Sequence, residues 1–245
     1  MNPDVEKVLA EIISIGTSED PTEHKRGVLS PGYSSLASFA ALLAKEPREE
    51  ALQQYLQANP QYLMALYGSN DDGDLAFICK PPIGTRYFAD FCVISYSQGG
   101  AGLELVELEP SSAELFTKAG TPARRLQGAI GQIDDWRQWI QVNTTTFIRD
   151  IIELAKALPL YESGKTSGSV RFKTPEDLEH VFRGFGGFEY PHVGYSVIIG
   201  RWARLSEAHR RRLIYMNREY GGQQRVYTYD QLARQALVRP DISFF

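Results

Sequence analysis

Acidic side chains lie on two strand-like runs that are neighbours in the sequence. Asp90 lies in the run 86–94, and Glu107 and Glu109 lie in the run 103–110. Side chains two residues apart on a strand point to one face, so Glu107 and Glu109 share a face. A hairpin that brings Asp90 beside Glu107 would gather hard oxygen ligands suited to Mg²⁺ or Mn²⁺. The spacing therefore predicts a divalent-metal site.

Acidic residues at strand edges are commonly solvated, and spacing alone favours that simpler interpretation. Two features count against it. The acids are embedded in strongly apolar strands, where an unpaired charge is costly. The helix expected next also places Gln132, Asp135 and Trp136 on or near one stripe, because residues three and four apart are neighbours on a helix.

The composition restricts the class of protein. A chain of 245 residues with 43% hydrophobic and 23% charged residues is typical of a globular protein, either one large domain or a domain with a small accessory layer. A net charge of −4 provides no global basic field, so a polyanion would be held by a local patch or by metal. Two cysteines without a Cys-x-x-Cys pair argue against structural zinc. Without a signal-like or membrane-length apolar run, we expect a reduced, cytoplasmic protein with no membrane partner.

The order of the elements predicts the fold. Periodicity, turn residues and prolines predict helices at 5–15, 34–45, 49–59, 123–143, 145–157, 206–220 and 230–236. They predict strands at 75–79, 87–95, 102–109, 195–200 and 225–229. The first three strands form an antiparallel meander, and the whole is an α/β fold with a mixed central sheet flanked by helices. Residues 161–174 are polar and rich in glycine and serine, which predicts a linker or loop.

Four separated segments resemble a known family. They are Leu56-Gln-Ala-Asn-Pro60; Asp90 with Val106-Glu-Leu-Glu-Pro110; Gln132-Ile-Asp-Asp-Trp136; and Val197-Ile-Ile-Gly-Arg201 with Asn217 and Thr228-Tyr-Asp230. They resemble the restriction-endonuclease-like superfamily, whose motif is Asp…(Asp/Glu)-x-Lys across a strand hairpin followed by a helix. More closely, the chain is similar to the Shedu family of bacterial anti-phage defence nucleases. The likeness spans about residues 50–237, so we divide the chain into an accessory segment, 1–48, and a nuclease domain, 49–245.

The resemblance implies a Mg²⁺- or Mn²⁺-dependent deoxyribonuclease that hydrolyses phosphodiester bonds and assembles into a homo-oligomer. Asp90 and Glu107 would bind the metal, and the Leu108 carbonyl would complete its shell. Gln132 and Trp136 match a glutamine and an aromatic position that support the site or the DNA end.

Position 109 departs from the superfamily pattern. Glu109 occupies the place of the usual lysine, which would stabilise charge on the phosphate and help to orient the attacking water. A carboxylate does neither alone, but it would hold a second metal ion in a two-metal site. Glu109 therefore remains a candidate catalytic residue with a different role.

Other charged residues have both a functional and a solvent-exposed interpretation. Arg124 and Arg125 open the helix that carries Gln132 and would contact a DNA phosphate, or they are simply solvated. The same two interpretations apply to the basic run 210–212. Glu49 and Glu50, which open the helix before the core, would supply an extra acid to the site or are simply solvated, and solvation is the favoured interpretation.

Two alternatives to the nuclease remain. The first is a catalytically weakened DNA-binding or sensor subunit that keeps the fold, which Glu109 and the net charge of −4 support. The second is a scaffold that oligomerises through residues 161–192.

Overall fold

The computed structural model describes residues 2–15, 33–67, 75–97, 100–156, 192–219 and 223–238. The linker expected at 161–174 lies outside the described residues. So does the proposed oligomer contact at 161–192, except for its last residue.

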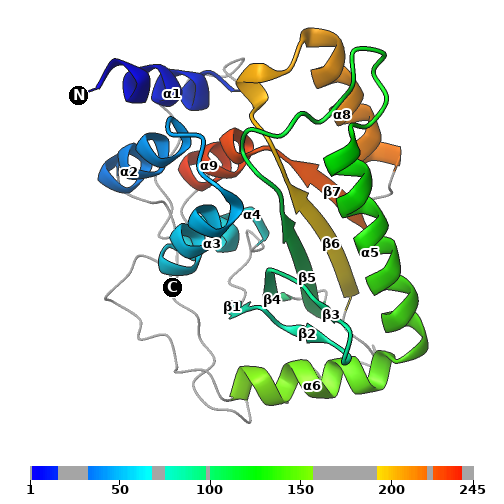
Figure 1. The fold of residues 1–245 in the computed structure, drawn as a ribbon. Helices are drawn as coiled ribbons and strands as arrows, with labels where there is room; N and C mark the ends of the chain where they lie inside the picture. The colour runs from blue at the N-terminus through cyan, green and yellow to red at the C-terminus, as the bar shows by residue number, and fades with distance from the viewer. Residues whose placement is uncertain are drawn as a thin grey trace.

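A five-stranded mixed sheet runs through the molecule in the order β1-β4-β5-β6-β7 (Figure 1). The strands are β1 (Leu75–Cys79), β4 (Phe91–Ser97), β5 (Gly100–Leu108), β6 (His192–Ile198) and β7 (Gln224–Tyr227). The first three pair antiparallel, whereas β5, β6 and β7 pair parallel. The predicted meander and the predicted mixed sheet are both confirmed.

The strand expected at 87–95 is interrupted at Ala89 and Asp90. Its first part is β3 (Tyr87–Phe88), which pairs with β2 (Pro82–Ile83) in a separate two-stranded sheet. The prediction of one continuous strand at 87–95 is therefore wrong. An alternation of apolar side chains does not reveal a break in strand pairing.

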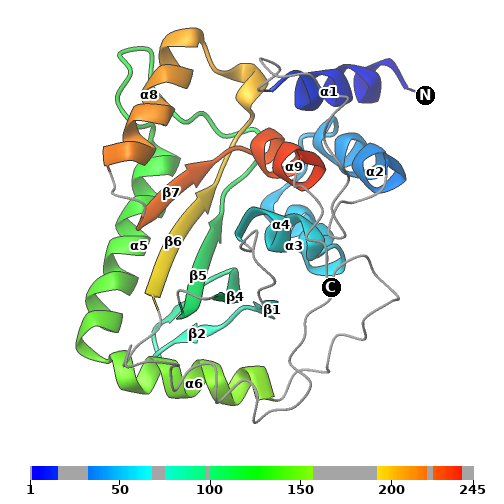
Figure 2. The ribbon, with the colours of Figure 1, turned by 180° about the vertical axis from the view of Figure 1, so that it is seen from behind.

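Helices cover both faces of the sheet, as Figures 1 and 2 show. On one side lie α1 (Pro3–Ser14), α2 (Tyr33–Leu43), α3 (Glu49–Ala58), α4 (Gln61–Tyr67) and α9 (Tyr229–Val238). The others are α5 (Arg124–Val142), α6 (Thr144–Lys156), the short η1 (Trp202–Arg204) and α8 (Glu207–Glu219). Among the described helices, none combines the length and the apolar character that a membrane crossing requires.

Each face of the sheet has its own apolar core. Leu103 and Leu105 of β5 pack with the apolar stripe of α5, which includes Leu126, Ile133 and Trp136. On the other face, residues of α1 and α2 join those of α3, α4 and α9 around the alternate side chains of β4 and β5. The buried residues of the N-terminal helices therefore belong to the same core as the rest of that layer.

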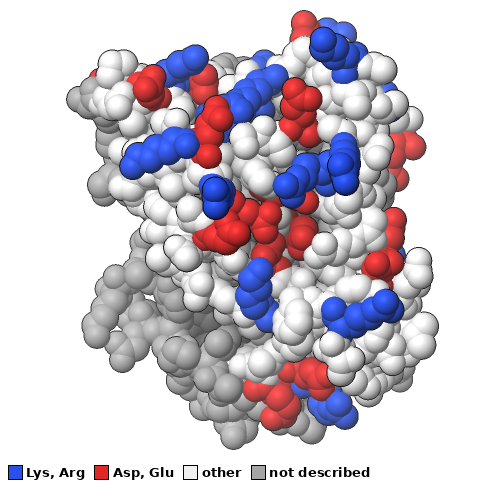
Figure 3. Space-filling model, in the orientation of Figure 1, with Lys and Arg blue, Asp and Glu red and all other residues white. Residues whose placement is uncertain are grey.

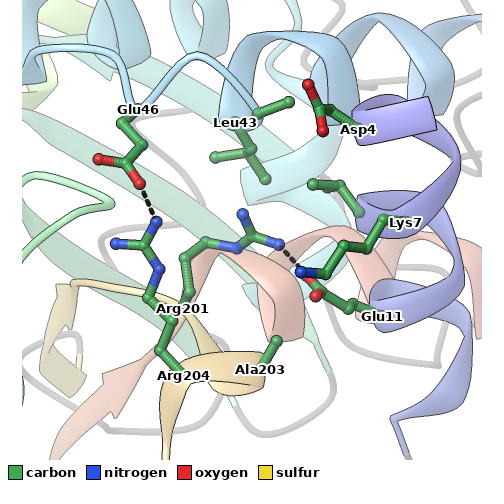
Figure 4. A pocket seen from close by; sticks show the side chains of 10 residues that line it. Asp4, Lys7, Glu11, Leu43, Glu46, Arg201, Ala203 and Arg204 are labelled. Atoms are coloured by element: carbon green, nitrogen blue, oxygen red, sulfur yellow. Dashed lines mark hydrogen bonds and ion pairs between the residues drawn. The ribbon is translucent and has the colours of Figure 1, made fainter. Parts of the chain in front are cut away.

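A buried ion pair joins the end of β6 to α9 and α1. Arg201 is 5% exposed and binds Asp230, which is fully buried, through Nε at 2.8 Å and Nη2 at 2.7 Å. Nη2 also donates to Glu11 of α1 at 3.0 Å. Figure 4 shows Arg201 reaching Glu11 across a pocket of about 360 Å³, with the exposed pair Arg204–Glu46 beside it. Two segments of the family likeness, 197–201 and 228–230, thus meet in one interaction.

Gly200 lets the chain turn sharply before Arg201. Its φ is +61°, and a Cβ at this position would lie 2.5 Å from the Ala113 carbonyl oxygen. Its backbone N–H donates to the Pro110 carbonyl at 3.1 Å. Only glycine fits this left-handed and crowded corner, which fixes the end of β6 against the segment that follows Glu109.

Breaking the buried pair is expected to destabilise the fold. Arg201→Met leaves the Asp230 carboxylate without its partner, and loss of one partner of a buried pair typically costs about 3–5 kcal/mol of unfolding free energy. Arg204→Gln, which removes only an exposed pair, is the matched control and is expected to cost less than about 1 kcal/mol. Urea unfolding measures both, and equal losses for the two variants would contradict this account.

Candidate metal centre

Asp90 lies at a bulge where β4 begins. Its backbone N–H donates to the Val106 carbonyl at 3.0 Å, although Val106 is already paired with Phe91. Two residues of one strand therefore oppose one residue of the other, which is the arrangement of a β-bulge and redirects the side chain. Asp90 Oδ2 accepts a hydrogen bond from the Leu108 backbone N–H at 2.7 Å. The hairpin thus brings the Asp90 carboxylate beside residues 107 and 108, as the sequence predicted.

Lys80 neutralises the other oxygen of Asp90. Its Nζ lies 2.5 Å from Oδ1, and Gln53 Nε2 donates to the same oxygen at 3.3 Å. Lys80 directly follows β1, and its φ of +50° is unusual for a residue other than glycine. The contact of Lys80 with Asp90 was not predicted from the sequence. Lys80 directly precedes Pro81 and Pro82, where the sequence indicated only a turn between strands.

Glu107 is the acid with the most unfavourable surroundings. Among the described residues, its side-chain carboxyl group has no hydrogen-bond or ion-pair partner. Burial raises its pKa to about 9, and the charges of Asp90, Glu49 and Glu109 contribute in the same direction. Lys80 opposes them only in part. In the absence of a further cation, this carboxyl group therefore holds a proton at neutral pH.

Glu49, the first residue of α3, also belongs to this cluster. Its pKa is raised by burial first and then by the charges of Asp90 and Glu109. The half-buried Glu49 therefore fits the alternative of an extra acid better than the favoured solvated one, whereas Glu50 is exposed as expected. The helix α3, which begins at Glu49, also carries part of the family-like segment Leu56–Pro60. Its contact with the end of the sheet could not be predicted from the sequence.

Glu109 is held by its neighbours. The residue is 9% exposed, and its carboxylate pairs with Arg125 Nη1 at 3.2 Å. Its backbone carbonyl accepts a hydrogen bond from the buried Tyr229 hydroxyl at 2.8 Å. Burial raises the pKa of Tyr229, and the charges of Asp90, Glu49, Glu109 and Glu107 raise it further. All four acids therefore lie close enough to Tyr229 for their charges to act on its hydroxyl group.

The helix α5 carries the remaining predicted site residues. Arg125 reaches Glu109, while Arg124 is exposed. Gln132 is partly buried, and its side chain makes no hydrogen bond within the described residues. Trp136 is fully buried in the core, so it packs against the sheet and has no surface to offer to DNA. This placement corrects the expected DNA contact, because the same 3.6-residue stripe that suggested a site is the stripe that faces the core.

Glu104 shows that not every acid of β5 joins the cluster. It lies three residues before Glu107, accepts a hydrogen bond from Ser196 of β6 and has its pKa raised by burial to about 7. Residues three positions apart on a strand point to opposite faces, so the Glu104 side chain points away from the face that Glu107 shares with Glu109. Glu104 is therefore a buried acid of the same strand that lies outside the site.

The donors of the cluster fit a Mg²⁺-type ion. Mg²⁺ is usually bound by one or two carboxylates and completes its shell with water and substrate oxygens. Asp90 and Glu107, with the Leu108 carbonyl, supply such an incomplete set of hard ligands. In the described part of the chain, no three acidic, histidine or cysteine side chains form a preassembled metal cage, and an incomplete set requires none.

The surface around the cluster has a distinct charge pattern. In Figure 3, acidic side chains gather near the centre of the face, and lysine and arginine side chains border them. Lys80 is 54% exposed and Arg125 64% exposed, and each contacts one acid of the cluster. A negatively charged ligand would meet these cations first, while a divalent ion would be attracted to the centre.

Comparison with known families supports the sequence resemblance. A family model described as "Shedu protein SduA, C-terminal" matches residues 46–233, which include every residue of the cluster. No curated protein matches the chain.

The raised pKa of Glu107 predicts a pH dependence of stability. Because its pKa rises from an ordinary 4.5 to about 9 in the folded protein, folding retains a proton that the unfolded chain releases. The free energy of unfolding of metal-free protein should therefore fall as the pH rises through this window. Glu107→Gln, which stays neutral, is expected to flatten the decline in urea unfolding measured from pH 5 to 9. The exposed control Glu114→Gln should retain the wild-type slope, and an unchanged slope in Glu107→Gln would refute the prediction.

Proposed function

The chain belongs to the family described as "Shedu protein SduA, C-terminal". On this basis we propose that it is a divalent-metal-dependent DNA nuclease of anti-phage defence. One observation carries the proposal. Within the described part of the chain the Glu107 carboxyl group has no hydrogen bond, and the charges of three other acids act on it. Such an arrangement is unfavourable for folding alone, and a bound cation would relieve it.

Asp90 and Glu107 are the proposed metal ligands, with the Leu108 carbonyl beside them. The Leu108 N–H fixes Asp90 at 2.7 Å, and Tyr229 fixes the chain at Glu109. These contacts hold the ligands on a rigid sheet end, where small shifts would otherwise lower the affinity for metal. A divalent ion bound there would polarise the phosphate and lower the pKa of water.

The proposed reaction is hydrolysis of a phosphodiester bond. The oxygen of water adds to phosphorus, and the bond from phosphorus to the 3′ oxygen breaks. One proton of the water ends on the leaving oxygen, so the products are a 3′-hydroxyl and a 5′-phosphate. Glu49 and Glu107 are carboxylates placed at the reacting centre that would orient the water.

Glu109 and Arg125 complete the proposed substrate site. Their ion pair places a guanidinium at the border of the acid cluster, and guanidinium groups bind phosphate in bidentate geometry. We propose that Glu109 positions Arg125 for a DNA phosphate. Arg124, exposed on the same helix turn, would add a second phosphate contact. A second metal at Glu109 would require Arg125 to move away.

The second candidate function is a DNA-binding or sensor subunit without cleavage. The observation that favours it is the Arg125–Glu109 pair, since a carboxylate stands at the lysine position of the superfamily and is already neutralised. The two functions differ in one result, which is whether DNA that binds the protein is cut.

Cleavage should depend on the two ligands. We expect the full chain to cut linear, nicked or supercoiled plasmid DNA with Mg²⁺ or Mn²⁺. Asp90→Asn and Glu107→Gln remove a ligand charge and are expected to lower the rate at least about 100-fold. Gel assays of initial rates, together with metal titration by calorimetry, measure both effects.

Glu104→Gln is the matched control, because Glu104 is a buried acid of the same strand outside the cluster. It should cut at close to the wild-type rate. DNA that binds but remains intact with both metals would favour the sensor subunit, and equal loss in all three variants would indicate damage to the fold. The homo-oligomer predicted from the resemblance can be tested on the same samples by light scattering.

A further inference from the structure

Lys80 holds Asp90 with both its backbone and its side chain. Its backbone N–H donates to the Asp90 carbonyl at 2.9 Å, and its ammonium lies 2.5 Å from Oδ1. The left-handed backbone of Lys80, at φ +50°, is energetically costly for a residue with a side chain. The surrounding structure therefore fixes Lys80 at this position, where the β1 strand ends beside the acid cluster.

The ammonium of Lys80 lies directly on Oδ1 of the Asp90 carboxylate. Oδ2 is engaged by the Leu108 N–H, so a cation that binds Asp90 has Oδ1 available to it. Lys80 and Gln53 share that oxygen. A divalent ion at Oδ1 would meet the positive ammonium at about the contact distance of an ion pair, and the two like charges would repel each other. Lys80 and the metal therefore compete for one oxygen.

The Lys80 side chain can leave Asp90 without any change in the backbone. It is 54% exposed and its four-carbon stem rotates freely around a compact charge. Lys80 acts on Glu107 and Glu49 as well as on Asp90, since its charge opposes the rise of both their pKa values.

We propose that Lys80 is a catalytic residue with two successive positions. In the metal-free protein it neutralises Asp90, and when a divalent ion takes Oδ1 the ammonium turns to a non-bridging oxygen of the DNA phosphate. It then stabilises the negative charge that grows on the phosphate during attack by water. Lys80 thus supplies from the end of β1 the positive charge that position 109 lacks. This inference rests on the proposed nuclease function.

The test is Lys80→Gln, which keeps a polar side chain and removes the charge. Two effects of opposite sign are expected. Calorimetric titration of the full chain with Mn²⁺ in the absence of DNA should give about fivefold tighter binding than wild type, because the competitor is gone. Cleavage of plasmid at saturating Mn²⁺ should be about 100-fold slower. Lys118→Gln, which removes an exposed lysine from the loop before α5, controls for the general loss of positive charge and should change neither value appreciably.

The outcomes separate this inference from the nuclease proposal. If wild type cuts DNA, Glu107→Gln does not, and Lys80→Gln cuts at the wild-type rate or binds Mn²⁺ no more tightly, the role of Lys80 is overturned and the nuclease stands. If wild type neither binds Mn²⁺ nor cuts DNA, both fail. Thermal melting checks the fold of each variant. If Lys80→Gln does not fold, Lys80→Arg takes its place, and it should retain wild-type Mn²⁺ affinity while cutting more slowly, because the rigid guanidinium matches the ammonium in charge but not in reach.

Discussion

Repulsion among four carboxylates at one end of the sheet is the constraint on which the site depends. Asp90, Glu107 and Glu109 come from two adjacent strands, and Glu49 joins them from α3. Two cations, Lys80 and Arg125, each pair with one acid and leave Glu107 without an ion pair. The fold keeps these acids close together because buried apolar layers on both faces of the sheet hold the strand ends in place. In the proposed function, a divalent cation binds to this cluster.

The positions of the acids rest on contacts behind the site. The Tyr229 hydroxyl fixes the chain at Glu109, and the next residue, Asp230, binds Arg201 at the end of β6. Arg201 in turn reaches α1. The N-terminal helix, which precedes the family match at residue 46, is thereby linked to the strand ends that carry the acids. This chain of contacts gives the residues before the matched region a defined structural relation to the site.

Much of the fold was predictable because local patterns and tertiary packing agree. The seven predicted helices begin and end within about two residues of their predicted bounds, since prolines, glycines and apolar stripes mark them. The short helices α4 and η1 were not predicted. The proximity of Asp90 to the second strand of the hairpin was also predictable, because a short hairpin leaves few possible registers. Lys80, Glu49 and the bulge at Asp90 could not be predicted in this way. Their roles arise from contacts between segments distant in the chain, and Trp136 shows that a helical stripe does not distinguish a site from a core.

The location of a divalent ion tests the central claim most directly. Crystals of the full chain soaked in Mn²⁺ can be measured at a wavelength where manganese scatters anomalously. The account predicts an anomalous peak at about 2.0–2.3 Å from carboxylate oxygens of both Asp90 and Glu107, with the Lys80 ammonium displaced from Asp90 Oδ1. Saturating Mn²⁺ that leaves no peak between these two residues, with Lys80 still bound to Asp90, would contradict it.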